Sequence, residues 1–434
     1  MKFSFAASLL VFALSGTTAQ AIIIELDYTY DTNDFFDQPG SKEALRAVAD
    51  FYEERINDNL LRIDQSEFSD AEWSATFFSP DTGVSLSVPN LIVPEDTIIV
   101  FVGGRDIGAL GSGGPGGLNY KGIPAWEERL LERGQSRAGE LPPTDFSLWG
   151  GSIVFDLVLG SGSSWNFSVD SPVSPASEFD FVSTALHEFG HLLGIGTSEA
   201  WEAHTDAGDL FNGPQSVASF GEPVPVQVEG QNGRHGHWQD DDGCAFPLGY
   251  TPGNPLNVLS LSYGSFGSEH AVPQIARMDP RSCGVSNRTA MLVMTDLDMA
   301  ALRDIGWEVQ MPQTLEVLSL NPTDASFEWP SSTGETYFLQ RSTDLVAGWS
   351  DLSPLTAGDG SILSFADPSP PAAQAFYRLS DTSTLASSSS SVSRLSASNS
   401  SEPSVASSNR SADTPVTWVS VPPRLVDGCG VCSH

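Results

Sequence analysis

The segment "STALHEFGHLLGIG" at residues 183–196 carries two histidines and a glutamate at spacings typical of metal chemistry. His187 and His191 are four residues apart, so on a helix both imidazoles project from one side and can bind a single ion. Glu188 stands beside the first histidine, where its carboxylate can accept a proton from a metal-activated water. The pattern His-Glu-x-x-His therefore predicts a zinc site with Glu188 as its general base.

The third metal ligand is not evident from the motif. Gly194 predicts a turn that ends the helix, because glycine adopts a positive φ with little strain. Three residues later the chain carries Thr197, which is a poor zinc ligand. Candidate ligands among the remaining histidines are His204, which follows the helix most closely, and the pair His235 and His237 in a polar, glycine-rich segment.

A glutamate from the segment after the helix is the second way to complete a zinc site. Glu199 and Glu202 are available, although both lie in what the sequence predicts to be a turn. Calcium is a further candidate ion, with Asp156 and Asp170 as possible oxygen ligands, but the spacing of an EF-hand loop is missing.

The longer pattern His-Glu-x-x-His-x-x-Gly resembles that of the metzincin zinc endopeptidases. The later segments "PVPV", "HW", "MDP" and "DLDMAALRDIGW" are similar, in this order, to leishmanolysin-type enzymes and related secreted bacterial metalloproteases. The resemblance covers residues 147–307. It implies that His237, next to Trp238, is the third zinc ligand, and that Met278 forms the tight turn beneath the metal.

The same resemblance implies a fold and an activity. The fold is of the α/β (α+β) class, with a twisted mixed sheet and an active-site helix. The activity is that of a secreted endopeptidase with one catalytic zinc ion and a protein or peptide substrate. In this family an edge strand just before the helix pairs with the extended substrate, and "SLWGGSIVFDLVL" at residues 147–159 is the strand expected to do so.

Other elements follow from the hydrophobic pattern. We expect strands at residues 22–31 and 97–104 and an amphipathic helix at 41–58. The glycine-rich stretch 108–117 lacks the Gly-Lys-Ser/Thr ending of a phosphate-binding loop, which favours a flexible surface loop. Capping boxes predict that the metal-binding helix begins around residues 177–180 and that a closing helix begins at 295–298 and ends at Gly306.

The chain divides into five parts by composition. Residues 1–21 are a signal peptide with an Ala-x-Ala cleavage site, and residues 22–311 form the metalloprotease-like domain. Short alternating strands at 312–380 indicate a small all-β sandwich resembling fibronectin-type modules, whose partner the sequence does not identify. Residues 381–417 are a serine-rich linker, and 418–434 are a C-terminal tail, in which Cys429 and Cys432 favour a local disulfide or a disordered end.

Charge and hydropathy restrict the partners and the location of the protein. The formal net charge of −35 argues against nucleic acid and anionic membranes as partners. The apolar run in the signal peptide is too short to span a bilayer, and no later run is long enough, so we expect an exported protein without a transmembrane segment. The alternative function is a non-catalytic exported adhesion or binding protein that keeps the metzincin shell.

Overall fold

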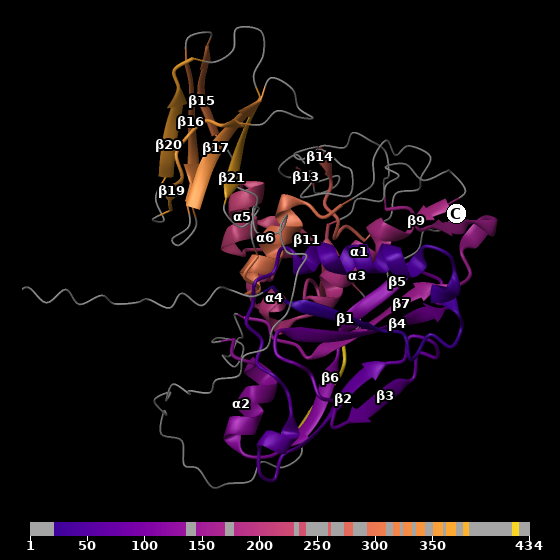
Figure 1. Cartoon of the computed structure of the whole chain (residues 1–434). Coiled ribbons are helices and arrows are strands. Elements are labelled where there is room, and N and C mark those ends of the chain that lie inside the picture. Colours follow the sequence, from indigo (N-terminus) through magenta and orange to yellow (C-terminus); the bar gives the residue numbers. More distant parts are fainter. Residues whose placement is uncertain are drawn as a thin grey trace, which may run out of the picture. The chain divides into compact units, whose positions relative to one another are not determined.

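The computed structural model describes residues 21–135, 145–169, 178–229, 234–239, 259–261, 273–280, 293–309, 316–321, 324–331, 336–342, 350–358, 362–369, 376–381 and 419–424. The chain forms two compact units (Figure 1). The larger unit comprises Met1–Met311 and Arg410–His434, and the smaller unit comprises Pro312–Asn409. Residues 1–20 of the expected signal peptide, residues 382–417 of the serine-rich linker, Asp170 and all four cysteines lie outside the described residues.

A mixed four-stranded sheet lies at the centre of the larger unit, with the strand order β1-β4-β7-β5. Its strands are β1 (Ile23–Asp27), β4 (Thr97–Arg105), β7 (Gly150–Asp156) and β5 (Gly111–Pro115). β4 is parallel to both β1 and β7, whereas β5 is antiparallel to β7. The apolar run at 97–104 is the buried strand that the sequence predicted, since a strand covered on both faces carries continuous apolar residues.

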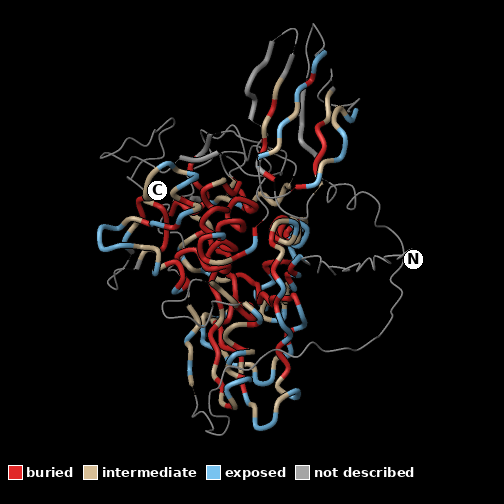
Figure 2. Tube along the Cα trace, turned by 90° about the vertical axis from the view of Figure 1, so that its left-hand side faces the viewer, coloured by how far each residue is buried: buried red, intermediate tan, exposed pale blue. Residues whose placement is uncertain are grey.

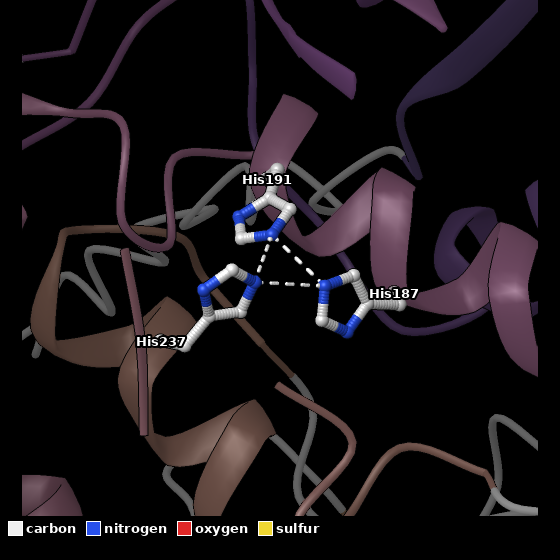
Figure 3. A group of neighbouring side chains, drawn as sticks. All are labelled: His187, His191 and His237. Carbon is white, nitrogen blue, oxygen red and sulfur yellow. Dashed lines mark hydrogen bonds between the residues drawn. The ribbon is translucent and has the colours of Figure 1, made fainter. Parts of the chain in front are cut away.

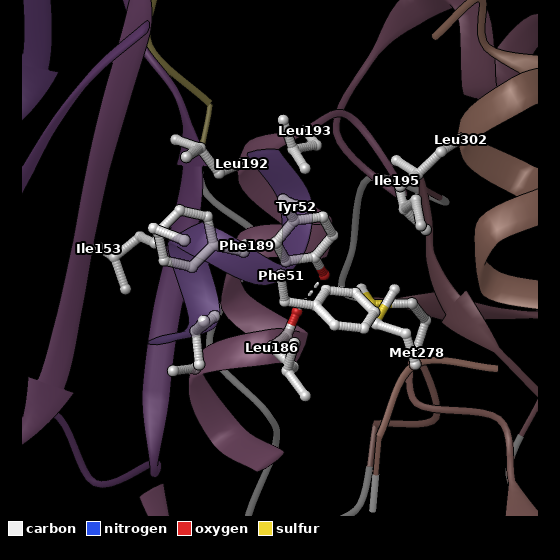
Figure 4. Close-up of a cluster of buried hydrophobic side chains, with 14 of the residues drawn as sticks. Phe51, Tyr52, Ile153, Leu186, Phe189, Leu192, Leu193, Ile195, Met278 and Leu302 are labelled. Carbon is white, nitrogen blue, oxygen red and sulfur yellow. Dashed lines mark hydrogen bonds between the residues drawn. The ribbon is translucent and has the colours of Figure 1, made fainter. Parts of the chain in front are cut away.

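Two helices, α1 (Ser41–Glu53) and α3 (Phe181–Leu192), pack together on one face of this sheet. Every residue of α3 is buried, which explains its largely apolar sequence. The Tyr52 hydroxyl donates to the Leu186 carbonyl over 2.7 Å and joins the two helices. Figure 4 shows the side chains of this core around Phe189, and Figure 2 shows how completely the interior of the larger unit is buried.

The opposite face of the central sheet packs against a second, antiparallel sheet with the order β22-β6-β2-β3. Its strands are β22 (Val419–Val421), β6 (Gly117–Lys121), β2 (Glu72–Phe78) and β3 (Ser85–Pro89), and α2 (Pro124–Glu132) adds Trp126 and Leu130 to the same core. Residues 418–434 were predicted to be a C-terminal tail. Within them, Val419–Val421 forms an outer strand of this sheet, and Val419 and Val421 pack against the apolar core beneath it.

The glycine-rich stretch 108–117 is not a surface loop as predicted. Residues 111–115 form β5, which is buried along its whole length and pairs with β7. The prediction failed because glycines carry no apolar side chain that would indicate burial, although they permit a close approach to α3. In consequence β7 is an interior strand, and β5, not β7, is the edge strand nearest the metal-binding helix.

The two capping predictions have different outcomes. The helix α3 begins at Phe181, and Asp180 caps it by accepting hydrogen bonds from Ser183 at both nitrogen and hydroxyl. The predicted start at residues 177–180 is wrong, since Glu178–Asp180 forms the short strand β9, which pairs with β8 (Ser164–Asn166). The closing helix α6 (Asp296–Asp304) has the predicted capping box, and Gly306 follows its end with φ of 112°.

The remaining elements of the larger unit connect α3 to α6. They are α4 (Glu199–His204), β10 (Leu210–Phe211), α5 (Pro214–Phe220), β11 (Val224–Glu229), β12 (Arg234–Trp238), β13 (Leu259–Leu261) and β14 (Pro273–Ile275). Three short 3-10 turns lie at Phe35–Asp37, Gln65–Glu67 and Gly160–Gly162. Within the described part of the chain, every helix is too short or too polar to cross a bilayer.

The smaller unit contains two antiparallel sheets around one apolar core. One sheet has β15 (Glu316–Asn321), β16 (Asp324–Pro330) and β20 (Ile362–Asp367); in the other, β17 (Thr336–Ser342) pairs with β18 (Ser350–Asp351), β19 (Thr356–Ala357) and β21 (Phe376–Asp381). The core comprises Phe327, Trp329, Tyr337 and Leu339. The short alternating strands expected at residues 312–380 are present among the described residues.

Candidate metal centre

Three imidazole rings converge in the interior of the larger unit (Figure 3). The Nε2 atoms of His187 and His191 lie 3.0 Å apart, and the Nε2 atom of His237 lies 3.1 Å from the first and 3.0 Å from the second. All three side chains are buried. Among the described residues this is the one group of three or more histidine, cysteine or carboxylate side chains close enough together to hold a metal ion.

Backbone carbonyls fix the orientation of the two helix histidines. The Nδ1 atom of His187 lies 2.7 Å from the carbonyl oxygen of Arg277, and that of His191 lies 2.9 Å from the carbonyl oxygen of Ile195. The turn that returns Ile195 to the helix depends on Gly194, which has φ of 108°. Gly194 therefore ends α3 as predicted and also places the acceptor for one of the two histidines.

These hydrogen bonds determine what the Nε2 atoms can bind. A carbonyl oxygen only accepts, so the Nδ1 atoms of His187 and His191 must carry the proton, and each neutral ring then points an Nε2 lone pair at the other. Lone pairs 3.0 Å apart repel unless a cation lies between them. Burial is the main reason that the pKa values of both histidines lie well below the usual range, which disfavours a proton as that cation.

The spacing of the nitrogens fits a metal ion. Zn–N bonds of about 2.0–2.1 Å at tetrahedral angles would separate ligand nitrogens by about 3.3 Å. The observed separations of 3.0–3.1 Å are close to that value. Histidine Nε2 ligands whose Nδ1–H groups bind carbonyls are typical of such sites. The three histidines can therefore bind a metal ion.

His237 reaches the centre from β12, and its neighbour His235 does not. Val226 pairs with Trp238 and Gln227 with His237, but Val228 pairs with His235, so Gly236 is an extra residue in β12. This bulge breaks the alternation that would have turned His235 and His237 to the same side. His235 instead contacts Glu202 and Asp209, at 3.3 Å and 2.9 Å.

Two tryptophans hold the strand that carries His237. The Trp201 indole donates to the carbonyl of His235 over 2.7 Å. The backbone N–H of Trp238 donates to the Met278 carbonyl over 3.0 Å, and its indole donates to Asp298 over 2.9 Å. His237 is thus fixed from both sides, by α4 and by the residues before and within α6.

Asp298 links the strand that carries His237 to the turn whose Arg277 carbonyl faces His187. Its buried carboxylate accepts hydrogen bonds from the Trp238 indole and from the backbone N–H groups of Arg277 and Met278, at 2.9, 2.7 and 3.1 Å. The same carboxylate accepts from the N–H and hydroxyl of Thr295, which completes the cap of α6. From the sequence, Asp298 was identified only as part of a capping box. The spacing of Thr295 and Asp298 does not indicate the contacts of Asp298 with Trp238, Arg277 and Met278.

Met278 lies directly beneath the metal-binding turn of α3. Its side chain is fully buried, and a Cβ on Gly190 would collide with its sulfur atom. The turn around it is closed by a hydrogen bond from the Asp279 N–H to the Ala276 carbonyl. The role of Met278 as the turn beneath a metal ion, which the resemblance implies, stays a prediction.

The other candidate ligands lie elsewhere. The Nε2 atom of His204 lies 2.9 Å from the Asp304 carbonyl. Glu199 and Glu202 belong to the helix α4 rather than to a turn, and they contact Arg424 and His235, respectively. The Thr197 hydroxyl donates to the His191 carbonyl over 2.7 Å, so it satisfies a carbonyl at the end of α3. Asp156, a candidate for calcium, accepts from the Ile107 N–H instead.

Glu188 lies beside the three histidines with both of its carboxylate oxygens buried and without a hydrogen-bond partner among the described residues. Burial raises the pKa of Glu188 to about 8, and the nearby positive charge of Arg277 and the backbone N–H of Gly113 partly offset this. A bound dication would lower that pKa further. An unpartnered buried carboxylate next to a metal site is available to bind a water molecule or a substrate N–H group.

The backbone of strand β5 packs closely against Glu188. A Cβ on Gly111 would lie 2.8 Å from the Glu188 side chain, and one on Gly113 would lie 2.5 Å from its carbonyl oxygen. Only glycine fits at these two positions. This strand was not predicted to lie beside the histidines; the one signal of it in the sequence is the density of glycines in "GSGGPGG".

The chain gives no match to protein-family models, to curated proteins or to solved structures. What the centre can do therefore follows from its own residues.

Proposed function

We propose that this protein is a zinc-dependent endopeptidase of the metzincin type. The observation that carries the proposal is the buried group of His187, His191 and His237 with the unpartnered carboxylate of Glu188 beside it. The turn at Met278 beneath α3 and the interrupted motif completed from β12 support the same family. The signal peptide expected at residues 1–21 would direct such an enzyme to export.

The residues of the chain divide the chemistry between them. His187, His191 and His237 would hold the ion. A zinc ion at such a site acts as a Lewis acid toward the scissile carbonyl and makes water more acidic. The Glu188 carboxylate takes the proton from the attacking water and passes it to the nitrogen of the leaving amine. Among the described residues its carboxylate oxygens form no hydrogen bond of normal geometry, which leaves them available for both transfers.

A peptide substrate is favoured by the geometry of β5. The Leu110 carbonyl accepts from the Asp156 N–H, and the Gly116 N–H donates to the Gly150 carbonyl. The backbone groups of the even-numbered residues of this segment therefore point toward β7. The N–H and carbonyl groups of Gly111 and Gly113 accordingly face the outer edge of the sheet. An extended peptide can pair with that edge through its main chain, next to Glu188.

The rival proposal is an exported binding protein that uses the metal only for stability. Such a protein gains nothing from Glu188, since burial of an unpartnered carboxylate is costly. That cost is understandable if the carboxylate acts on a substrate. We therefore favour the enzyme.

The test compares two histidines that lie two residues apart on β12. We expect His237→Ala to lose bound zinc, measured by elemental analysis of the purified chain, and to lose casein cleavage. His235→Ala is the matched control, because His235 lies on the same strand but contacts Glu202 and Asp209. It should keep about one zinc ion per chain and most of the activity.

Cleavage by the wild-type chain should also stop on addition of a chelator and return with added zinc. A chain that cleaves casein equally with and without chelator would contradict the proposal. Zinc loss in His235→Ala but not in His237→Ala would contradict the assignment of the third ligand.

A further inference from the structure

Arg277 is a buried arginine whose charged side chain has no partner in the described part of the chain. The residue is 2% exposed, and its Nε and Nη1 atoms are buried without a hydrogen bond. Burial of a charge is costly unless the charge is paired and hydrogen-bonded, because the group loses its hydration. The chemistry assigned to the three histidines and Glu188 makes no use of this guanidinium.

Arg133 shows how the same fold accommodates a buried arginine that serves the structure. Its guanidinium donates to four backbone carbonyls at 2.9, 3.0, 2.7 and 3.2 Å, those of Leu61, Thr97, Leu148 and Pro94, respectively. Both arginines are buried, but Nε and Nη1 of Arg277 have no such acceptor. Since a structural arginine requires acceptors from the fold, the acceptor of Arg277 is expected to come from a ligand.

The backbone of Arg277 fixes the residue at the metal centre. Its N–H donates to the Asp298 carboxylate over 2.7 Å, and its carbonyl oxygen lies 2.7 Å from Nδ1 of His187. The next residue, Met278, is fully buried beneath α3. Both hydrogen bonds involve only backbone atoms of residue 277, so a change of its side chain leaves these contacts available.

The charge of Arg277 acts on two side chains of the centre. Burial raises the pKa of Glu188 to about 8, and the positive charge of Arg277 is the main effect that opposes this rise. Burial is also the main cause of the low pKa of His187, to which the charge of Arg277 adds. Nevertheless, the Glu188 oxygens and the Arg277 nitrogens Nε and Nη1 form no hydrogen bond with each other. The guanidinium is therefore close to the proposed base without being occupied by it.

We propose that Arg277 binds a carboxylate group of the peptide substrate, supplied by an aspartate or glutamate side chain or by a free C-terminus. The planar guanidinium presents N–H groups in a fork that matches the two oxygens of a carboxylate. A neutral amide in the same place would leave the buried charge unpaired. That the ligand is a peptide rests on the proposed function, whereas the unpaired charge is a property of the fold.

Peptide binding is measured by calorimetry on zinc-loaded Glu188→Gln, so that the peptides stay intact during the titration. Three alanine pentapeptides are compared: one has a central glutamate and blocked ends, one has a central glutamine and blocked ends, and one has the glutamine and a free C-terminal carboxylate. We expect one of the two carboxylate peptides to bind at least about tenfold more tightly than the neutral peptide, as charge-assisted hydrogen bonds do. The tighter of these two identifies the source of the carboxylate.

Substitutions assign this preference to Arg277. Arg277→Met in the same chain should keep its zinc and bind the three peptides about equally, and Arg277→Lys should keep only part of the preference because it lacks the fork. Arg303→Met is the matched control, since Arg303 is exposed on α6 and its substitution removes the same charge. Equal binding of the three peptides by the parent chain, or a preference that survives in zinc-loaded Arg277→Met, would overturn the proposal.

Thermal stability gives a second readout that does not depend on peptides. Because an unpaired buried charge destabilises the protein without ligand, Arg277→Met with Glu188 intact should have a Tm equal to or above that of the wild type. Arg133→Met should lower the Tm, because four carbonyls lose their donor. A Tm of Arg277→Met below that of the wild type would also overturn the proposal, since the charge would then be paired within the fold. If no form of the protein cleaves peptides, the proposed function fails, whereas the binding and Tm comparisons still decide the role of Arg277.

Discussion

Asp298 shows how a single carboxylate can position a metal ligand that it does not touch. It binds the Trp238 indole next to His237, and it binds the N–H of Arg277, whose carbonyl faces His187. Two of the three histidines therefore depend on one side chain in α6. Partners of this kind set the orientation of the ligands and hence the affinity for the metal.

We predict that Asp298→Ala weakens zinc binding by about 10–100-fold, because both His187 and His237 lose their support. The measurement is competition with a chelator of known zinc affinity. Asp304→Asn is the matched control, since Asp304 is a buried carboxylate on the same helix that binds the N–H groups of Gln215 and Ser216 instead. Equal zinc affinity in Asp298→Ala and in the wild type would refute the assignment.

At the scale of elements, a buried acid joins the segment after α1 to the segment after α6. Asp58 follows α1, and its carboxylate accepts from the Glu308 N–H over 3.1 Å and from the Gln135 amide over 3.3 Å. Burial raises the pKa of Asp58 to about 7; the Glu308 N–H lowers it, and the negative charges of Glu308 and Asp145 add to the rise. The folded protein therefore keeps a proton that the unfolded chain releases near its ordinary pKa of 3.8.

The sign of the pH dependence follows from this difference. Because the unfolded state binds fewer protons between about pH 4 and pH 7, the contribution of Asp58 to stability falls as the pH rises through that range. We predict that Asp58→Asn raises the Tm of zinc-loaded protein at pH 8 and leaves it nearly unchanged at pH 4. The expected rise is roughly 2–4 °C for each kcal/mol gained in the free energy of unfolding.

Calorimetry at pH 4, 6 and 8 measures this effect. The exposed carboxylate of Asp37 supplies the control, since Asp37→Asn should follow the wild-type pH dependence. A lower Tm of Asp58→Asn at pH 8 would mean that the charged form of Asp58 stabilises the fold, contrary to our account.

Among these elements, the sequence could predict the residues of α3 but not the strand beside them. His187, His191, Glu188 and Gly194 were identified because helical spacing alone brings them together. Their neighbour β5 was mistaken for a loop, because a strand of glycine, serine and proline has no hydrophobic pattern to indicate it.

Contacts between distant segments were harder to predict. The bulge at Gly236, which separates His235 from His237, depends on the register of two strands and is not encoded in the local sequence. The return of Val419–Val421 to the larger unit spans the entire smaller unit, so no local pattern could indicate its partner.

At the scale of the whole molecule, the smaller unit is an insertion between two parts of the larger unit in sequence. Each unit has its own apolar core, and the metal centre belongs entirely to the larger one. A ligand stabilises only the unit that binds it, by an amount that grows with its concentration relative to Kd.

We therefore predict two calorimetric transitions, of which zinc shifts only one. Removal of zinc should lower the Tm of the transition assigned to the larger unit and leave the other in place. Trp329→Ala identifies the second transition, since it removes a large side chain from the core of the smaller unit and leaves β22 in the larger unit in place. A single transition that moves as a whole with zinc would show that the two units unfold together.

The proposed activity depends on Glu188 acting as the base beside a histidine-bound zinc ion. The most direct measurement determines bound zinc and peptide cleavage in the same preparations of the wild type and Glu188→Gln. We predict one zinc ion per chain in both, with cleavage reduced at least about a hundredfold in Glu188→Gln. Undiminished cleavage by Glu188→Gln at full zinc occupancy would contradict the central claim.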